Sequence, residues 1–488
     1  MNNWHLGKIG RRLWAAFLAA MLVGIILAPS LRAQDATNHP SGRREPNIIF
    51  ILADDLGYGD LGCYGQNEIK TPNIDKLAEE GMRFTSFYAG STVCAPSRCA
   101  LMTGKHNGHS RIRGNGEIPL SPEDVTVAEV LKKAGYQTAA IGKWGLGERN
   151  STGVPGKKGF DQWFGYLNQV DAHNYYPLFL NRSDPRHGDR QVQLPENEGG
   201  QKGRYSDDFF TDAALNVIRL DQPKWYTKYQ PFFLYLAYTI PHANDELGTA
   251  TGNGMEVPSD APYSGESWPQ VEKNKAAMIT RLDTDVGLIL EKIQKLKMDN
   301  TVVIFSSDNG THKEGGVDPK FFKSAGLLRG IKRDLYEGGI RVPFIVWWPG
   351  RVKPGTTSDL PAAFWDFLPT AADIADAKAP QDIDGISFLP TLLGQKQTNW
   401  HEFLYWEFHE DGFNQAVRMG DWKAVRFGVD GPLQLFNLKD DIGEKKNVAA
   451  EHPEIVAKIE DYLKTARTED SNWPVKTAAE SSKKEYGK

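Results

Sequence analysis

The chain has 488 residues, of which 40% are hydrophobic and 24% charged, with 48 Gly and 28 Pro. This composition is typical of a globular protein and excludes a disordered chain, a collagen and a coiled coil. The formal net charge of −5 argues against a nucleic-acid-binding protein, which would carry an excess of basic residues. Only three Cys are present, so a disulfide scaffold and a four-thiolate zinc site are excluded too.

Residues 1–33 have the pattern of a signal peptide. Three basic residues precede an acid-free apolar run from Leu13 to Ala28, and the small residue Ala33 marks the predicted cleavage point. An uncleaved membrane anchor is the alternative, although the run is short for a span of about 20 residues. We therefore expect a periplasmic or secreted protein that has no stable membrane span after cleavage.

Cleavage would change the charge of the protein. The leader contains four Lys and Arg and no Asp or Glu, so its removal leaves 53 basic against 62 acidic residues, a formal charge of −9. An anionic substrate would then have to be met by a local basic pocket rather than by a global field. The polar residues 34–45 that follow have no apolar periodicity and are predicted to be a linker.

From Pro46 onward, short apolar runs alternate with helical segments, which is typical of a doubly wound α/β fold with a mostly parallel sheet between helices. The predicted strands are Asn47–Ala53, Gln137–Gly142, Pro231–Thr239, Thr301–Ser307 and Val342–Trp348. The predicted helices are Pro72–Glu80, Thr126–Ala134 and Val271–Met298. We assign residues 46–382 to one catalytic domain.

The pattern changes after about Asp382. The segments that follow alternate as in an antiparallel sheet, with strands at Phe403–Phe408, Gln415–Met419, Trp422–Phe427 and Leu433–Asn437, and a last helix near Pro453–Thr465. This pattern predicts a smaller C-terminal α+β subdomain over residues 383–488, with a four-stranded antiparallel sheet covered by a helix.

Charged or reactive side chains follow four of the predicted strands: Asp54 and Asp55, Lys143, His242, and Asp308 and Asn309. In open α/β sheets, ligands bind beyond the carboxyl ends of the strands, where such residues converge. The two acidic pairs offer only oxygen ligands, which suits one hard cation such as Ca²⁺ or Mg²⁺. The cations Arg98, Lys143 and Lys332, together with His242, would surround an anion that this metal orients.

Cys94 begins the most distinctive segment, Cys94-Ala95-Pro96-Ser97-Arg98. Pro96 is tolerated in a first helical turn and Gly104 closes the predicted helix, so Cys94 should lie at a helix N-terminus, where the dipole favours an anion. Cys94 is then either a small buried hydrophobic residue or a thiol nucleophile whose pKa is lowered by the helix and the metal.

Cys-x-Pro-Ser-Arg followed by Leu-x-Thr-Gly-Lys resembles the signature of the type I, formylglycine-dependent sulfatases, the arylsulfatase-like members of the alkaline phosphatase superfamily. Further segments extend the resemblance: Ile141-Gly142-Lys143-Trp144, Ile240-Pro241-His242, Ser307-Asp308-Asn309-Gly310 and Arg329–Gly339. The resemblance spans about residues 46–345. It implies an alkaline-phosphatase-like fold and a hydrolase of sulfuric esters.

The resemblance also implies a mechanism. A separate formylglycine-generating enzyme would convert Cys94 to formylglycine (3-oxoalanine), whose hydrate is a geminal diol that attacks sulfur. One Ca²⁺ would be bound by Asp54, Asp55, Asp308, Asn309 and the modified Cys94. Asp308 would also act as the base, Arg98 and Lys143 would hold the diol, and His242 and Lys332 would contact the sulfate and protonate the leaving oxygen.

Gly145 departs from the family pattern, which has a His that orients the diol at this position. His173 is our candidate to replace it, and His106 and His109 are weaker alternatives. Once Cys94 is modified, Cys63 and Cys99 are left as an even pair that could form a disulfide in an oxidising compartment.

Export and an aromatic-rich sequence favour a sulfated carbohydrate as the substrate, with subsites built by residues 181–204 and 245–268. One alternative is a phosphoester or phosphonate hydrolase, because a fold alone does not determine the reaction. The other is a non-catalytic sulfoglycan-binding protein in which Cys94 remains a thiol.

Overall fold

The computed structural model describes residues 44–116, 118–221, 230–410 and 412–481. The predicted signal peptide, and the linker apart from its last two residues, lie outside the described residues. The described residues within 45–223 and 230–488 form one compact unit. No helix among them is long and apolar enough to cross a membrane.

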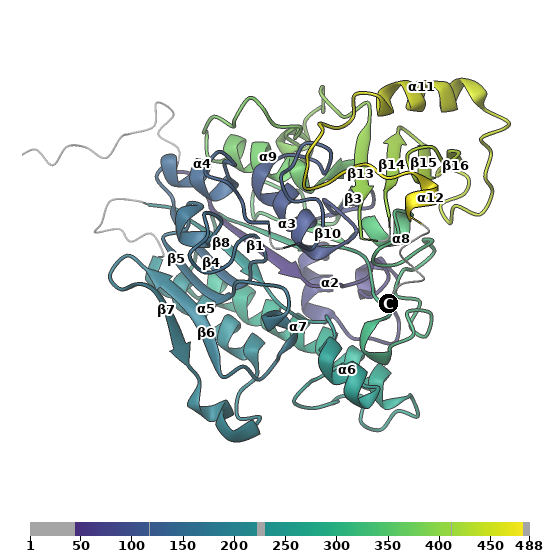
Figure 1. Cartoon of the computed structure of the whole chain (residues 1–488). Helices are drawn as coiled ribbons and strands as arrows, with labels where there is room; N and C mark the ends of the chain where they lie inside the picture. Colours follow the sequence, from purple (N-terminus) through teal and green to yellow (C-terminus); the bar gives the residue numbers. More distant parts are fainter. Residues whose placement is uncertain (1–43, 117, 222–229, 411, 482–488) are drawn as a thin grey trace, which may run out of the picture. The chain divides into compact units, whose positions relative to one another are not determined.

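The main sheet has ten strands among the described residues, in the order β11-β2-β10-β9-β1-β8-β4-β5-β6-β7 (Figure 1). The five central strands from β9 to β5 are parallel, whereas β10 and β6 run antiparallel to their neighbours. The strands are β1 (Asn47–Ala53), β2 (Met82–Phe84), β4 (Gln137–Lys143), β5 (Gln162–Tyr166), β6 (Phe179–Asp184), β7 (Gly188–Gln193), β8 (Phe232–Ala237), β9 (Thr301–Ser307), β10 (Phe344–Trp347) and β11 (Thr356–Ser358). The predicted mostly parallel sheet is confirmed.

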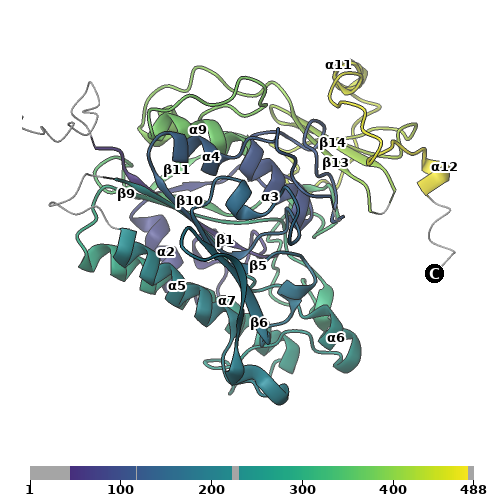
Figure 2. The same cartoon turned by 60° about the vertical axis from the view of Figure 1, so that its left-hand side comes forward.

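Helices cover both faces of this sheet, which explains why the central strands are continuous apolar runs. Alternate side chains of β1 point to opposite faces: Phe50 packs with α3, α4 and α9, and Ile51 packs with α2, α5 and α7. Figure 2 shows these two groups of helices on either side of the sheet. The helices are α2 (Pro72–Glu79), α3 (Cys94–Thr103), α4 (Val127–Lys133), α5 (Ser206–Asp221), α7 (Gln270–Lys295) and α9 (Phe367–Ile374).

The C-terminal part contains the antiparallel sheet that the sequence predicts, in the order β13-β14-β15-β16. Its strands are β13 (Leu404–Phe408), β14 (Asn414–Met419), β15 (Trp422–Phe427) and β16 (Gln434–Asn437), and residues of α11 (Pro453–Leu463) pack on it. The Trp406 indole of β13 donates to the Ala89 carbonyl, 2.9 Å away, just after β3 (Phe87–Tyr88). Strand β3 pairs with β12 (Ala362–Ala363). The remaining short helices are α6 (Asp245–Thr251), α8 (Glu337–Ile340), α10 (Leu389–Leu392) and α12 (Ala478–Ser481).

Cys63 and Cys99 do not form the disulfide that the sequence allowed, since both thiols are free. Cys99 lies on α3 in the hydrophobic core that covers one face of the main sheet. Cys63 is half-buried and packs against the core on the other face. The sheet between the two cores keeps the side chains apart.

Candidate active site

Two adjacent strands bring the predicted acidic residues together. In the register of β1 and β9, Ala53 is opposite Ser307, so the residues that follow each strand emerge side by side. The Asp55 amide donates to Asp308 Oδ1 at 3.1 Å, and Asn309 Nδ2 donates to Asp55 Oδ1 at 2.7 Å. Asp55 also has a φ of +65°, a strained conformation for a residue with a side chain, and such strain concentrates at functional sites.

Cys94 is the first residue of α3, as predicted, and all ten residues of this helix are buried. Its Sγ lies 3.5 Å from Asp54 Oδ1. Burial raises the pKa of the Cys94 thiol well above its usual value, more than the nearby Lys143 lowers it. The protein surroundings alone therefore favour the protonated thiol over the thiolate that a cysteine nucleophile requires.

Three buried cations pair with the three carboxylates. Lys143 Nζ lies 2.7 Å from Asp54, Arg98 Nη2 lies 2.8 Å from Asp308, and Lys332 Nζ lies 2.8 Å from Asp55. Burial disfavours a charge on Asp54, but the charges of Lys143 and Arg98 hold its pKa well below its usual range. The four predicted strand ends, the start of α3 and the loop that carries Lys332 thus converge on one cluster.

His242 lies between this cluster and Glu314. Its Nδ1 is 2.6 Å from the Ala243 carbonyl, so Nδ1 carries the proton and Nε2 is left as the acceptor. Nε2 lies 3.0 Å from Lys332 Nζ, and burial together with the charge of Lys332 lowers the pKa of His242 well below its usual value. Lys332 Nζ also lies 2.8 Å from Glu314.

The donor set fits one hard cation. Its side chains are oxygen donors, and all four are buried: Asp54, Asp55, Asp308 and Asn309. Asn309 Oδ1 is a buried oxygen without a hydrogen-bond partner in the described part of the chain, which is expected of an oxygen that serves as a metal ligand. Ligand atoms of Asp54, Asp55, Cys94 and His242 lie within 4.8 Å of one another, close enough to share an ion.

The three histidines proposed to compensate for Gly145 have different positions. The His173 ring stacks on His242 with 4.9 Å between the ring centroids, and its Nδ1 lies 3.2 Å from Glu246 at the start of α6. His106 and His109 instead follow the far end of α3, where His109 Nδ1 lies 2.8 Å from Asp384. A helix of ten residues is about 15 Å long, so these two alternatives are wrong.

Sequence reasoning missed two polar residues near this cluster, Glu314 and Gln169. Glu314 accepts from Lys332 and Arg333, and both amide atoms of Gln169 are buried beside Gly145. Each lies several positions beyond the end of a strand, in a loop that folds back. The sequence offered only one indication of each: Glu314 comes two positions after His312, and Gln169 comes four positions before His173.

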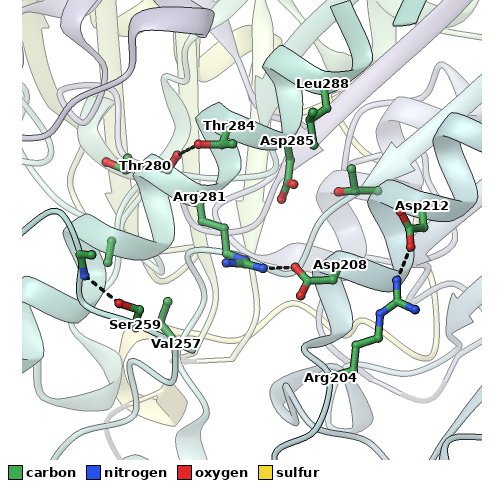
Figure 3. A pocket seen from close by; sticks show the side chains of 13 residues that line it. Arg204, Asp208, Asp212, Val257, Ser259, Thr280, Arg281, Thr284, Asp285 and Leu288 are labelled. Carbon is green, nitrogen blue, oxygen red and sulfur yellow. Dashed lines mark hydrogen bonds and ion pairs between the residues drawn. The ribbon is translucent and has the colours of Figure 1, made fainter. Parts of the chain in front are cut away.

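A separate cavity lies between α5 and α7 (Figure 3). Its lining includes Asp208, which pairs with Arg281, and Asp212, which pairs with Arg204. Asp285 also lines it, and its Oδ2 is buried without a partner among the described residues. The cavity shares no residue with the cluster around Cys94.

Comparison with known proteins decides the family. The model of the family described as sulfatase matches residues 46–377, two thirds of the chain. The chain belongs to the sulfatase family. A second model, described as N-sulphoglucosamine sulphohydrolase, C-terminal, matches residues 331–469 of this sulfatase. The protein is therefore an enzyme that hydrolyses sulfate esters.

Curated sulfatases and a solved structure resemble most of the chain. The N-acetylgalactosamine-6-O-sulfatase of Bacteroides thetaiotaomicron is 30% identical over 92% of this chain and 99% of its own. The human N-acetylgalactosamine-6-sulfatase is 33% identical over 74% of this chain and 68% of its own. The crystal structure of Ps i-CgsB in complex with k-i-k-neocarrahexaose has a TM-score of 0.72 and 29% identity, covering 86% of this chain and 93% of that one.

Proposed function

We propose that this sulfatase removes sulfate from a sulfated carbohydrate, with residue 94 acting as formylglycine beside one Ca²⁺. The observation that carries the proposal is the position of Cys94, which is buried at the start of α3 among paired carboxylates and cations. Burial disfavours the thiolate that a cysteine nucleophile requires, so an oxidised side chain is the better candidate for the nucleophile. The names of the relatives support a sugar sulfate as the substrate class.

Oxygen atoms of Asp54, Asp55, Asp308, Asn309 and residue 94 would hold the Ca²⁺. When bound, this cation supplies positive charge that orients and polarises a sulfate oxygen. Formylglycine, when hydrated, supplies a hydroxyl nucleophile in place of the thiol. Asp308 lies close enough to Asp55 and Arg98 to keep its orientation fixed, and we assign it the role of base for the attacking oxygen.

The remaining charged residues would bind the sulfate group and supply the proton for the leaving oxygen. Arg98 and Lys143 are oriented by ion pairs with Asp308 and Asp54 and would hold the nucleophile and the sulfate oxygens. The proton for the leaving oxygen would be held at Lys332 Nζ. This ammonium donates to His242 Nε2, and its acidic neighbours, foremost Asp55, raise its pKa well above the usual value despite burial.

The state of residue 94 is the direct test. Conversion of Cys to formylglycine lowers the mass of the Cys94 peptide by about 18 Da, which mass spectrometry of protein from its native host should detect. The Cys94→Ala variant should fold normally and release no sulfate. An unmodified peptide from a fully active preparation would refute the proposed nucleophile.

The choice between sulfate and phosphate requires a separate measurement. We expect kcat/KM for a sulfated saccharide to exceed that for the matched phosphate ester. A preference for phosphate would favour the alternative of a phosphoester or phosphonate hydrolase with the same fold. Treatment with a chelator should reduce the rate of sulfate release, and added Ca²⁺ should restore it.

We also propose that the enzyme is exported to the periplasm or secreted. The support is the charged, apolar and small-residue pattern of residues 1–33. N-terminal sequencing of the protein from its native host should begin at Gln34. A mature chain that retains Met1 or the apolar run would indicate an anchor instead.

A further inference from the structure

Gln169 is a half-buried residue that the proposed mechanism does not use. It lies three residues beyond the end of β5 (Gln162–Tyr166). Both its Nε2 and its Oε1 are buried, and neither has a hydrogen-bond partner in the part of the chain that the structure describes. Burying such groups unpaired costs about 1–3 kcal/mol each, so native proteins leave few of them without a partner.

The amide occupies space that only a glycine at position 145 leaves open. A Cβ on Gly145 would lie 2.0 Å from Gln169 Nε2, far inside contact distance. The backbone holds the two segments together, since the Gly145 amide donates to the Leu167 carbonyl at 3.0 Å. Gly145 has a φ of +77°, a conformation that glycine adopts at little cost.

Active-site residues flank Gln169 on both sides. Gly145 lies two residues after Lys143, whose Nζ binds Asp54 and whose carbonyl accepts from Arg98. On the other side, four residues beyond Gln169, His173 stacks on His242. The unpaired amide therefore lies on the loop after β5, between the segment that is bonded to Gly145 and the ring that stacks on His242.

The chemistry of the amide indicates its partner. A carboxamide offers both donors and an acceptor, whereas sulfate oxygens only accept and would leave Oε1 unpaired. A hydroxyl both donates and accepts. We propose that Gln169 binds a hydroxyl group in the active site, supplied either by the hydrated side chain of residue 94 or by the saccharide. This inference rests on the proposed function.

The test is Gln169→Met, which keeps the length of the side chain and removes both polar groups. Kinetics with a sulfated saccharide should show kcat/KM reduced at least about tenfold, the loss expected for one or two hydrogen bonds to the reacting complex. A fall in kcat at constant KM would identify the hydroxyl as that of residue 94, and a rise in KM would identify it as that of the saccharide. The melting temperature should be unchanged or higher, because no buried polar group is left unpaired.

Gln162→Met is the matched control, since Gln162 begins the same strand and its amide is satisfied by Asp221 of α5 at 3.2 Å. We expect this variant to retain wild-type kinetics. A Gln169→Met enzyme within about twofold of the wild type would overturn the proposal and mean that the amide binds only water. A wild-type enzyme that releases no sulfate from any saccharide would instead refute the proposed function.

Discussion

His173 is our candidate to take the role of the histidine that is missing at position 145. The structure stacks it on His242, 4.9 Å between ring centroids, so its loss removes one wall of the site. We expect His173→Ala to lower turnover by at least about tenfold, within the range for a proton-transfer or orienting group. Steady-state kinetics of sulfate release would measure this effect.

His452→Ala is a suitable control for His173, because the His452 side chain is 37% exposed and lies just before α11, in the C-terminal part of the chain. This control should leave the kinetics unchanged. If His173→Ala matched the wild type as well, His173 would be a structural residue outside the reaction.

Asp285 on α7, in the cavity of Figure 3, should make stability depend on pH. Burial and the charge of Asp207 raise the pKa of Asp285 to about 8. The native state therefore keeps a proton that the unfolded chain releases above about pH 4, and stability falls as the pH rises from about 4 to 8. Asp285→Asn should raise the melting temperature more at pH 8 than at pH 5.

Asp461→Asn is the control for Asp285, because Asp461 on α11 is 79% exposed. Thermal unfolding followed by circular dichroism at both pH values would compare the variants with the wild type. An Asp285→Asn protein with the same pH slope as the wild type would show that Asp285 is ionised in the folded state.

Site residues could be predicted from the sequence where a charged side chain comes directly after a strand. Asp54 and Asp308 come immediately after buried strands, so topology alone places them together. Gln169 was not predictable, because its burial depends on the absence of a side chain at Gly145, 24 positions earlier. The free thiols of Cys63 and Cys99 show the same limit, since their separation follows from which face of the sheet each one packs on.

At the scale of single elements, helix α4 (Val127–Lys133) shows how much a capping motif contributes to the free energy of unfolding. Thr126 Oγ1 accepts from the Glu129 amide at 3.2 Å, and the Glu129 carboxylate accepts from the Thr126 amide at 2.9 Å, which completes a capping box. Thr126→Ala should lower the free energy of unfolding by about 1 kcal/mol and leave turnover unchanged. Thr126→Ser keeps the hydroxyl and should be close to the wild type in urea unfolding. Equal loss in both variants would contradict a capping role.

The central strands of the main sheet could be predicted from their apolar runs, whereas β6 and β7 at its edge could not. Strands β1 and β9 are fully buried and have apolar centres, and their bounds agree with the prediction. The hairpin of β6 and β7 was missed because its residues are largely polar and partly exposed, so no apolar alternation marks it. Its pairing depends on β5, a tertiary contact that local sequence does not encode.

At the scale of the whole molecule, a buried ionic cluster joins the C-terminal sheet to the rest of the fold. Lys423 of β15 lies 3.0 Å from Glu337 of α8 and 3.5 Å from Glu444, and all three side chains are fully buried. Burial opposes ionisation of Glu337, but Lys423 and Arg341 lower its pKa to about 2. Lys423→Met should reduce the free energy of unfolding by about 3 kcal/mol, because it leaves an incompletely paired buried charge.

The control for this cluster is Lys446→Met, which removes a 69% exposed Lys paired with Glu451 and should cost less than about 1 kcal/mol. Urea unfolding followed by tryptophan fluorescence and by circular dichroism should give one coincident transition for the wild type. Two separate transitions would show that residues 383–488 unfold independently, which would argue against tight coupling through Lys423.

The complete burial of α3 has a consequence for how active molecules arise. Cys94 is only 2% exposed, and the helix packs into two hydrophobic cores. If Cys94 is converted to formylglycine as we propose, an oxidising enzyme that binds the peptide around Cys94 cannot reach it in the native state, so conversion has to precede docking of this helix. The fraction of active molecules in a preparation then depends on the rate of Cys94 oxidation relative to the rate at which the chain folds. Conditions that slow folding should increase the yield of active enzyme from the same amount of chain.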